Sequence, residues 1–179
     1  LVGQIYEGPL EDVPWASAMR LVRQYLDANW VTLILRPASV NQQAILARAS
    51  EQGEDLYGAA YNQFQMFSLD PFVGLPSDQV LAIDEMVDTR KWIGGEFYKQ
   101  FIEPNNIRYI IGADIRVDGG GECRLRVTRP ARSRDFSEQD KEFCRQLLPH
   151  LKRSVKLRSR VEGIESERRL YAVAMDRMQ

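Results

Sequence analysis

The only histidine of the 179-residue sequence, His150, is the first candidate for chemistry. Hydrolytic catalysis needs a nucleophile, a base and a group that orients the base. His150 lies between Pro149 and Leu151 at the start of a run of lysines and arginines, and the sequence contains no G-x-S-x-G, H-E-x-x-H or C-x-x-C motif. These patterns predict that the chain is not an enzyme, and a small enzyme is the least favoured alternative.

Metal and cofactor sites are not indicated either. One histidine and two distant cysteines, Cys123 and Cys144, cannot supply a closed zinc shell, and the carboxylates do not follow the spacing of a calcium loop. The glycines at 119–121 lack the lysine and the helix start of a phosphate-binding loop, so they predict a hairpin turn. We expect no metal, no cofactor and reduced thiols.

Aromatic residues gather between residues 57 and 101. Such a cluster is either solid core or the wall of a small-molecule pocket with one or two polar anchors. Asp70, directly before Pro71, is a candidate anchor that could accept an N–H from a ligand, or it could cap its own loop. The candidate pocket residues are Tyr57, Tyr61, Phe64, Asp70, Phe72, Trp92, Phe97 and Phe101.

A second group that could do chemistry is a set of cations near the carboxyl end, which could bind phosphate groups. Glutamates follow at once, the formal net charge is −1, and no recognition-helix pair is visible, so we expect a solvated helix face rather than DNA contact. The cations are Arg145, Lys152, Arg153, Lys156, Arg158 and Arg160. The apolar runs are too short to span a bilayer and no secretion signal opens the chain, so we expect a cytoplasmic protein.

The amino-terminal elements that must position these residues are a helix and two strands. Apolar spacing over 11–28 predicts a helix that begins near Asp12. A buried strand follows and is ended by Pro37. Residues 40–50 fit a strand or a short helix, and we favour a strand that pairs with the first.

In the middle of the chain the spacing predicts a helix over 56–67, a loop over 68–78, a short apolar segment over 81–87 and a helix over 96–106 that ends at Pro104 and two asparagines.

Two alternating strands around the glycines, 107–117 and 122–130, predict a hairpin. Ser137 and Asp140 have the spacing of a capping box at the start of a long last helix. In the second strand, two sets should face opposite sides of the sheet: Cys123, Leu125 and Val127 against Arg124, Arg126 and Thr128. The order of elements predicts an α+β fold, a GAF- or PAS-like antiparallel sheet covered by helices on one face.

The last helix carries a heptad seam, in which residues recur at alternating spacings of four and three, with Arg168 as a polar interruption. The seam predicts either packing back on the domain or, as we favour, a parallel two-stranded coiled coil that leaves it. Pro149 should kink the helix near that point. The predicted dimerisation residues are Leu157, Val161, Ile164, Tyr171, Met175 and Met178.

Several short motifs in order, DPFVGLPSDQV, EFYKQFIEPNNIRYIIG, LRVTRP with DFSEQDKEF, and LLPHLKRSVKLRSRVEG, resemble the amino-terminal sensory half of LuxR-family transcriptional regulators. The resemblance covers residues 55–179 well and the first 50 in outline. It implies a GAF/PAS-like sensory domain over 1–150 and a dimerisation and signalling helix over 151–179. It also implies a carboxy-terminal helix-turn-helix that binds DNA and lies beyond this sequence, so we expect the chain to be part of a longer protein.

A narrower resemblance concerns the quorum-sensing members, whose pocket holds an acyl-homoserine lactone. Tyr57, Tyr61, Asp70 and Pro71 are spaced like their aromatic, tyrosine and Asp-Pro set, although Tyr57 stands where tryptophan is usual. The remaining chain is more similar to the non-quorum group.

Taken together, these patterns predict a ligand-sensing and dimerisation domain of a bacterial-type transcriptional regulator. Its expected partners are a second copy of itself and a small-molecule effector, with no nucleic acid or membrane bound by this fragment. The alternatives are a ligand-free structural dimerisation module and an acyl-homoserine-lactone-binding domain.

Overall fold

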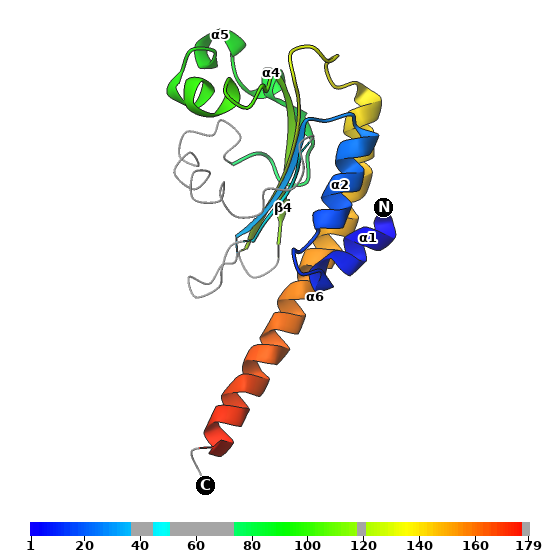
Figure 1. Ribbon diagram of the computed structural model, residues 1–179, viewed down its shortest axis with the longest axis vertical. Helices are drawn as coiled ribbons and strands as arrows, with labels where there is room; N and C mark the ends of the chain where they lie inside the picture. The colour runs from blue at the N-terminus through cyan, green and yellow to red at the C-terminus, as the bar shows by residue number, and fades with distance from the viewer. Residues whose placement is uncertain (37–44, 51–73, 118–120, 177–179) are drawn as a thin grey trace.

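The computed structural model describes residues 1–36, 45–50, 74–117 and 121–176. Five strands form one antiparallel sheet in the order β2-β1-β5-β4-β3 (Figure 1). The strands are β1 (Trp30–Arg36), β2 (Ile45–Ser50), β3 (Leu81–Ala82), β4 (Tyr109–Arg116) and β5 (Glu122–Arg129). The predicted α+β fold with an antiparallel sheet is confirmed.

The predicted hairpin is formed by β4 and β5, with Asp114 opposite Arg124. Alternation along β5 divides its side chains between the two faces of the sheet, as expected for a strand. The apolar set lies in the main core, where Leu125 is 2% exposed. The basic set is also buried, with Arg124 and Arg126 at 4% and 9% exposed, which the alternation alone does not predict.

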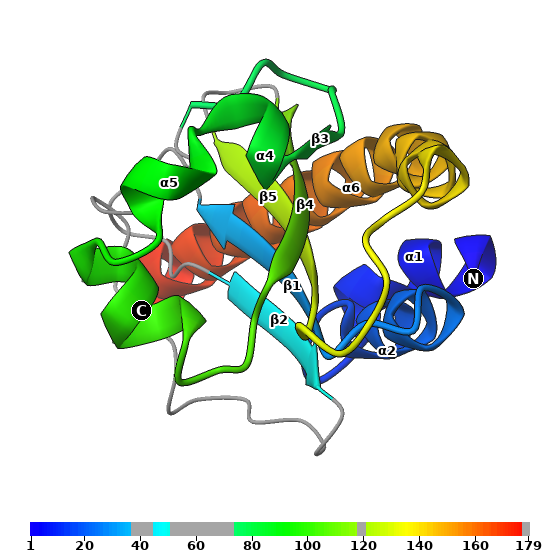
Figure 2. The same ribbon diagram turned by 90° about the horizontal axis from the view of Figure 1, so that it is seen from above.

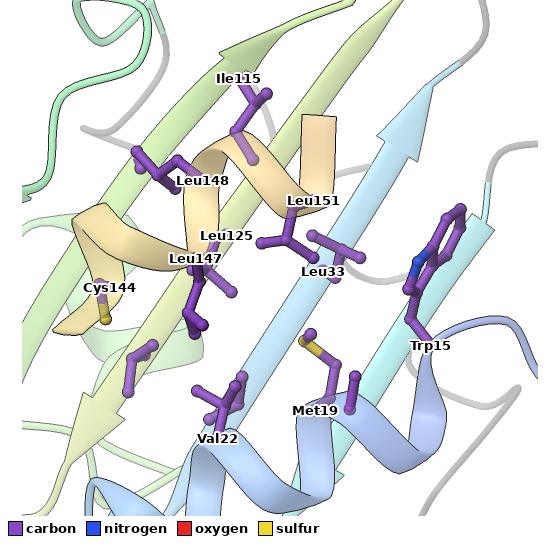
Figure 3. Packing of buried hydrophobic residues seen from close by; sticks show 14 of the residues in the cluster. Trp15, Met19, Val22, Leu33, Ile115, Leu125, Cys144, Leu147, Leu148 and Leu151 are labelled. Atoms are coloured by element: carbon purple, nitrogen blue, oxygen red, sulfur yellow. The ribbon is translucent and has the colours of Figure 1, made fainter. Parts of the chain in front are cut away.

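One face of the sheet is covered by α2 (Ala16–Tyr25) and the long helix α6 (Glu138–Asp176) (Figures 1 and 2). The short helix α1 (Val2–Glu7) and the 3-10 turn η1 (Gly8–Leu10) pack against these two helices. Figure 3 shows Met19 and Val22 of α2 and Leu147 and Leu151 of α6 meeting above Leu33 of β1. Full burial of each such side chain contributes roughly 1.5–3 kcal/mol, which accounts for the apolar spacing of both helices.

The structure corrects the predicted start of α2. The helix begins at Ala16 rather than near Asp12, because Trp15 has a left-handed backbone with φ 62°. The fully buried Trp15 side chain donates from Nε1 to Ser154 Oγ of α6 at 2.9 Å and to the Ile5 carbonyl at 3.2 Å. This tertiary contact sets the helix start, and no local pattern contains it. The sequence analysis also did not predict α1.

The opposite face of the sheet is crossed by short helices, so the predicted one-sided cover was incomplete. The apolar segment 81–87 contains β3 and α4 (Ile83–Met86), in which Glu85 accepts a hydrogen bond from the Ala82 N–H at 2.6 Å. Next come α5 (Thr89–Trp92), which was not predicted, and the π-type helix η2 (Tyr98–Ile102), which lies inside the helix predicted over 96–106.

Strand β2 pairs with β1 as favoured, whereas residues 40–44 and the helix predicted over 56–67 lie outside the described residues.

Helix α6 begins as predicted. The Ser137 N–H donates to Asp140 Oδ2 at 2.8 Å, and the Asp140 N–H donates to Ser137 Oγ at 3.2 Å, which is a capping box. The helix then continues through Pro149 to Asp176 without interruption. Pro149 is exposed, and its nitrogen donates no hydrogen bond to the carbonyl four residues earlier. Along the described residues, no helix combines the length and apolar character needed to cross a membrane.

Candidate functional site

A second apolar cluster lies on the sheet face opposite α2 and α6. It is built by the loop after residue 73, by α4, α5 and η2, and by the ends of β1 and β4, and it is separate from the main core. Its buried members are Leu75, Ile83, Trp92, Ile102, Ile107 and Ile110, and Trp30, Leu81, Val87, Phe97 and Tyr98 pack against them.

This cluster brings together part of the predicted aromatic pocket. Trp92 and Phe97 are both in it. Phe101 lies in η2, between Tyr98 and Ile102. The other predicted pocket residues, Tyr57, Tyr61, Phe64, Asp70 and Phe72, lie outside the described residues, so their contribution stays a prediction.

Trp92 is the most informative side chain of the cluster. It is 8% exposed and meets Tyr98 edge to face, with ring centroids 5.2 Å apart. Within the described part of the chain, its buried Nε1 has no hydrogen-bond partner. A buried donor left unpaired costs about 1–3 kcal/mol. A ligand oxygen that accepted this N–H would remove that cost.

Trp92 is held by irregular backbone rather than by a long helix. Ile93 follows it, then Gly94, with φ 98°, and Gly95, and the Gly95 N–H donates to the Trp92 carbonyl at 3.0 Å. The next helix, η2, is of the π type, a geometry that is frequent at functional sites.

Two residues at the start of β1 hold the turn that follows η2. Trp30 Nε1 donates to the Asn105 carbonyl at 3.2 Å, and Asn29 Nδ2 donates to the Asn106 carbonyl at 3.0 Å. Asn29 Oδ1 in turn accepts a 2.7 Å hydrogen bond from Thr128 Oγ1 on β5. The sheet therefore fixes the position of the η2 end of the cluster.

Beside the apolar cluster, the same sheet face carries buried charged groups. Arg126 Nη2 lies 2.8 Å from Asp114 Oδ1, and Arg126 Nη1 donates to the Ala113 carbonyl at 3.1 Å. Asp114 Oδ2 accepts the Leu75 N–H at 3.2 Å, which ties the loop of the cluster to β4. Sequence reasoning placed Arg126 on this face but missed its burial; the signal was a carboxylate on the partner strand of the hairpin.

A cation also packs on an aromatic ring at this face. The Arg48 guanidinium lies 3.6 Å from the centroid of the Trp30 ring, and Arg48 is 8% exposed. Such contacts contribute about 0.5–2 kcal/mol. The face therefore combines aromatic walls with polar groups, which is the composition of small-molecule sites.

His150 makes a structural contact rather than joining a catalytic set. Its Nδ1 lies 3.2 Å from the Tyr6 hydroxyl of α1, and the two rings meet edge to face. Cys123 and Cys144 are free and buried, and burial raises the pKa of each thiol to about 12, so neither is a ready nucleophile. Among the described residues, no group of three or more histidine, cysteine or acidic side chains could hold a metal ion.

Several cations of α6 are engaged with acidic side chains of the same chain. Lys152 Nζ lies 2.9 Å from Asp78, and Arg158 Nε lies 2.8 Å from Glu162. Arg145 contacts Glu138 and Glu142, at 3.2 Å and 2.9 Å. These intrachain pairs favour the predicted solvated face over a phosphate-binding patch.

The predicted seam is exposed where α6 extends past the sheet (Figure 1). Leu157, Val161 and Ile164 are 48%, 43% and 60% exposed. Tyr171 and Met175 lie further along the same helix, whereas Met178 is outside the described residues. Apolar side chains repeated along one protruding helix are typical of an interaction surface.

No protein-family model and no curated protein matches this sequence. Solved structures do match. The ligand-binding domain of VqsR from Pseudomonas aeruginosa is 14% identical, with a TM-score of 0.63 over 89% of this chain and 94% of that chain. A GAF domain from Synechocystis in its photoproduct state is 12% identical, with a TM-score of 0.59 over 92% and 99%. CepR2 from Burkholderia cenocepacia, an N-acylhomoserine lactone-dependent LuxR-family transcription factor, is 11% identical, with a TM-score of 0.51 over 86% and 89%.

At these identities the likeness shows the fold. The chain has the fold that LuxR-family ligand-binding domains share with GAF domains, as the resemblance in the sequence predicted. The similar structures are regulatory ligand-binding and sensor domains rather than enzymes.

Proposed function

We propose that this chain is the ligand-sensing and dimerisation domain of a cytoplasmic transcriptional regulator of the LuxR type. In this proposal, a small molecule binds between the sheet and the short helices that carry Trp92. Helix α6 pairs with α6 of a second copy as a parallel coiled coil, and the DNA-binding part lies outside this sequence. Residues 1–150 form the sensory part and 151–179 the signalling helix.

The observation that carries the sensory part is the buried Trp92 Nε1 without a described partner, in an aromatic cluster of a fold used by ligand-binding domains. A bound acceptor satisfies this donor, and a ligand that prefers one helix geometry shifts the population of that geometry. The boundary between residues 150 and 151 is part of the proposal. Among the described residues, α6 still contacts the amino-terminal segment beyond this boundary, since Arg158 donates to the Pro9 carbonyl at 2.7 Å.

The experiment that tests the proposal is native mass spectrometry of the chain after gentle purification from cells. We expect a dimer that carries an additional mass on the order of a few hundred daltons, the size of a ligand that such pockets hold. A bare dimer that gains no thermal stability from any member of a metabolite library would favour the ligand-free structural module. A bare monomer would contradict the dimerisation part.

One alternative ligand class has specific support. The spacing of Tyr57, Tyr61 and Asp70, together with the likeness to the lactone-dependent CepR2, favours an acyl-homoserine lactone. Saturating N-hexanoyl and N-dodecanoyl homoserine lactones can be added in a thermal unfolding assay. A rise in melting temperature that is lost in Asp70→Ala would establish this alternative, and no rise would set it aside.

A further inference from the structure

The heptad positions of the α6 seam continue toward the start of the helix, beyond the exposed apolar residues. Counting back from Leu157 by alternating steps of three and four leads to Ser154, His150 and Leu147. Residues at these spacings lie along one stripe of a helix. The stripe therefore runs along α6 from the part packed in the domain to the part that extends beyond it.

In the upper part of the stripe, the covering element is α1 of the same chain. Ser154 is fully buried, and its hydroxyl donates to the Ile5 carbonyl at 2.6 Å. One turn earlier, the Tyr6 ring lies edge to face on the His150 ring, with centroids 5.8 Å apart. Helix α1 thus occupies the place that a partner helix takes in a coiled coil.

Among the described residues, this intrachain cover ends at η1. The Pro9 carbonyl accepts a 2.7 Å hydrogen bond from Arg158 Nη1, and Arg158 directly follows Leu157 on the helix. The next residue of η1, Leu10, is 80% exposed. Figure 1 shows α1 lying against α6 where α6 leaves the rest of the molecule. Leu10 is therefore at the level where the covered stripe becomes the uncovered one.

We infer that α6 of a second copy takes over the stripe directly below α1 and η1, and that Leu10 forms part of this interface beside Leu157. The inference rests on the proposed dimerisation and adds to it a contact surface outside α6. A second copy fits the surface because the uncovered stripe is narrow and keeps the alternating spacing that an identical helix matches. From Arg158 to Asp176 the helix extends for about 27 Å. Because short helices are marginal by themselves, further apolar contact at the domain end stabilises the pair.

Sedimentation equilibrium of the whole chain tests the inference. Leu10→Asp should raise the dissociation constant of the dimer by about tenfold or more, because it places a charge in the interface. Ile164→Asp should give a monomer. Ile93→Asp is the matched control, since Ile93 is an apolar residue 45% exposed, next to Trp92 and therefore by the sheet face opposite α6. It should leave the dissociation constant within about twofold. Circular dichroism confirms that each variant folds.

A labelling experiment gives a second readout that does not need a charge. Leu10→Cys should react with a maleimide more slowly at protein concentrations above the dissociation constant than below it, whereas Ile93→Cys should react at one rate. Cys123 and Cys144 are buried and should not compete.

The results for these variants distinguish the proposed Leu10 contact from the proposed dimer through α6. If Ile164→Asp is monomeric while Leu10→Asp dimerises like the wild type, the Leu10 contact is wrong and the dimer through α6 stands. If the wild type is monomeric at all concentrations tested, both are wrong. If Leu10→Asp weakens the dimer and Ile164→Asp does not, the second copy contacts η1 without pairing along the seam. The inference that the two α6 helices pair along the stripe is then wrong.

Discussion

Trp92 is the residue on which the sensory proposal depends most directly. Its indole is buried against Tyr98, and its N–H has no partner among the described residues. In a solid core, a buried N–H without a partner only destabilises the fold. In a binding site it provides a donor aimed at an acceptor of the ligand.

We expect Trp92→Phe to weaken binding of the molecule retained in native mass spectrometry by about tenfold, the effect of one lost hydrogen bond. The phenylalanine ring should keep the aromatic contact with Tyr98. The dimer should be unaffected, because the cluster of Trp92 lies on the sheet face opposite α6. Occupancy of the purified variant and a titration with the identified molecule measure the change. Unchanged binding together with a lower free energy of unfolding would instead identify Trp92 as plain core.

Arg129 shows how a buried charge is accommodated at the start of α6. It is 2% exposed, donates from Nε to the Leu26 carbonyl at 2.9 Å, and lies 3.1 Å from Asp140. Burial by itself would raise the pKa of Asp140, but hydrogen bonds from Ser137 and the ion pair with Arg129 outweigh it, so the pKa is lowered from its ordinary value of 3.8. Asp140 thus caps the helix and neutralises Arg129.

A lowered folded-state pKa means that the Asp140 contribution is present above the ordinary pKa of 3.8 and is lost as the pH falls through the folded value. We expect Asp140→Asn to destabilise the chain by about 3 kcal/mol at pH 7, because a buried guanidinium loses its counter-charge. Below the folded-state pKa, the difference between wild type and variant should shrink. Urea unfolding from pH 7 to acidic pH measures both, and a difference that does not depend on pH would contradict this assignment.

At the scale of elements, α6 has two different surroundings along its length. Its first turns pack on the sheet through buried residues such as Leu147 and Leu151, whereas Leu157 and Ile164 are exposed. The heptad count that contains Leu157 and Ile164 passes through Leu147 in the packed part, so the same register continues where the helix changes its surroundings. The element that supplies the change is η1, where the intrachain cover ends.

Arg168 lies at a seam position and is exposed. A polar residue at such a position lowers the stability of a coiled coil while specifying its register. We therefore expect Arg168→Leu to tighten the dimer by about tenfold, and sedimentation equilibrium measures it. Ser159→Leu, on the outer side of the helix, is the matched control and should leave the dimer unchanged. Equal tightening by both substitutions would mean that association is non-specific and that the seam is misassigned.

At the scale of the whole molecule, the loop and helix that follow residue 73 contact both the aromatic cluster and α6. Leu75 and Ile83 belong to the cluster. Within the same segment, Asp78 pairs with Lys152 at 2.9 Å and Glu85 pairs with Lys141 at 2.7 Å. A ligand that displaced this segment would therefore also act on α6.

Hydrogen exchange checks the arrangement of the whole molecule. We expect Ile164→Asp to remove protection from the amides of residues 159–176, because a helix without a partner frays. The amides of the sheet should keep their protection, since the main core does not involve Ile164. Loss of protection throughout the sheet would mean that the helix and the domain form one cooperative unit, which would contradict the proposed division.

Features that depend on a local pattern could be predicted from the amino-acid sequence. Alternation placed the two sides of β5, the Ser137–Asp140 spacing located the start of α6, and the heptad count identified the exposed stripe through Ile164. Each of these depends on residues within a few turns or on one strand pair, so the periodicity of helix or strand is enough to find them.

Features that join distant segments of the chain could be found only from the folded structure. Helix α2 begins directly after Trp15, whose indole donates to Ser154, 139 residues away, and no short window of sequence contains both residues. The burial of Arg126 required its carboxylate on the neighbouring strand, and Trp92 became a donor without a partner among the described residues only once other elements enclosed it. Burial and pairing are properties of what surrounds a side chain. A periodic pattern predicts the face of a helix or strand on which a residue lies, whereas the side chains that it contacts there depend on the fold.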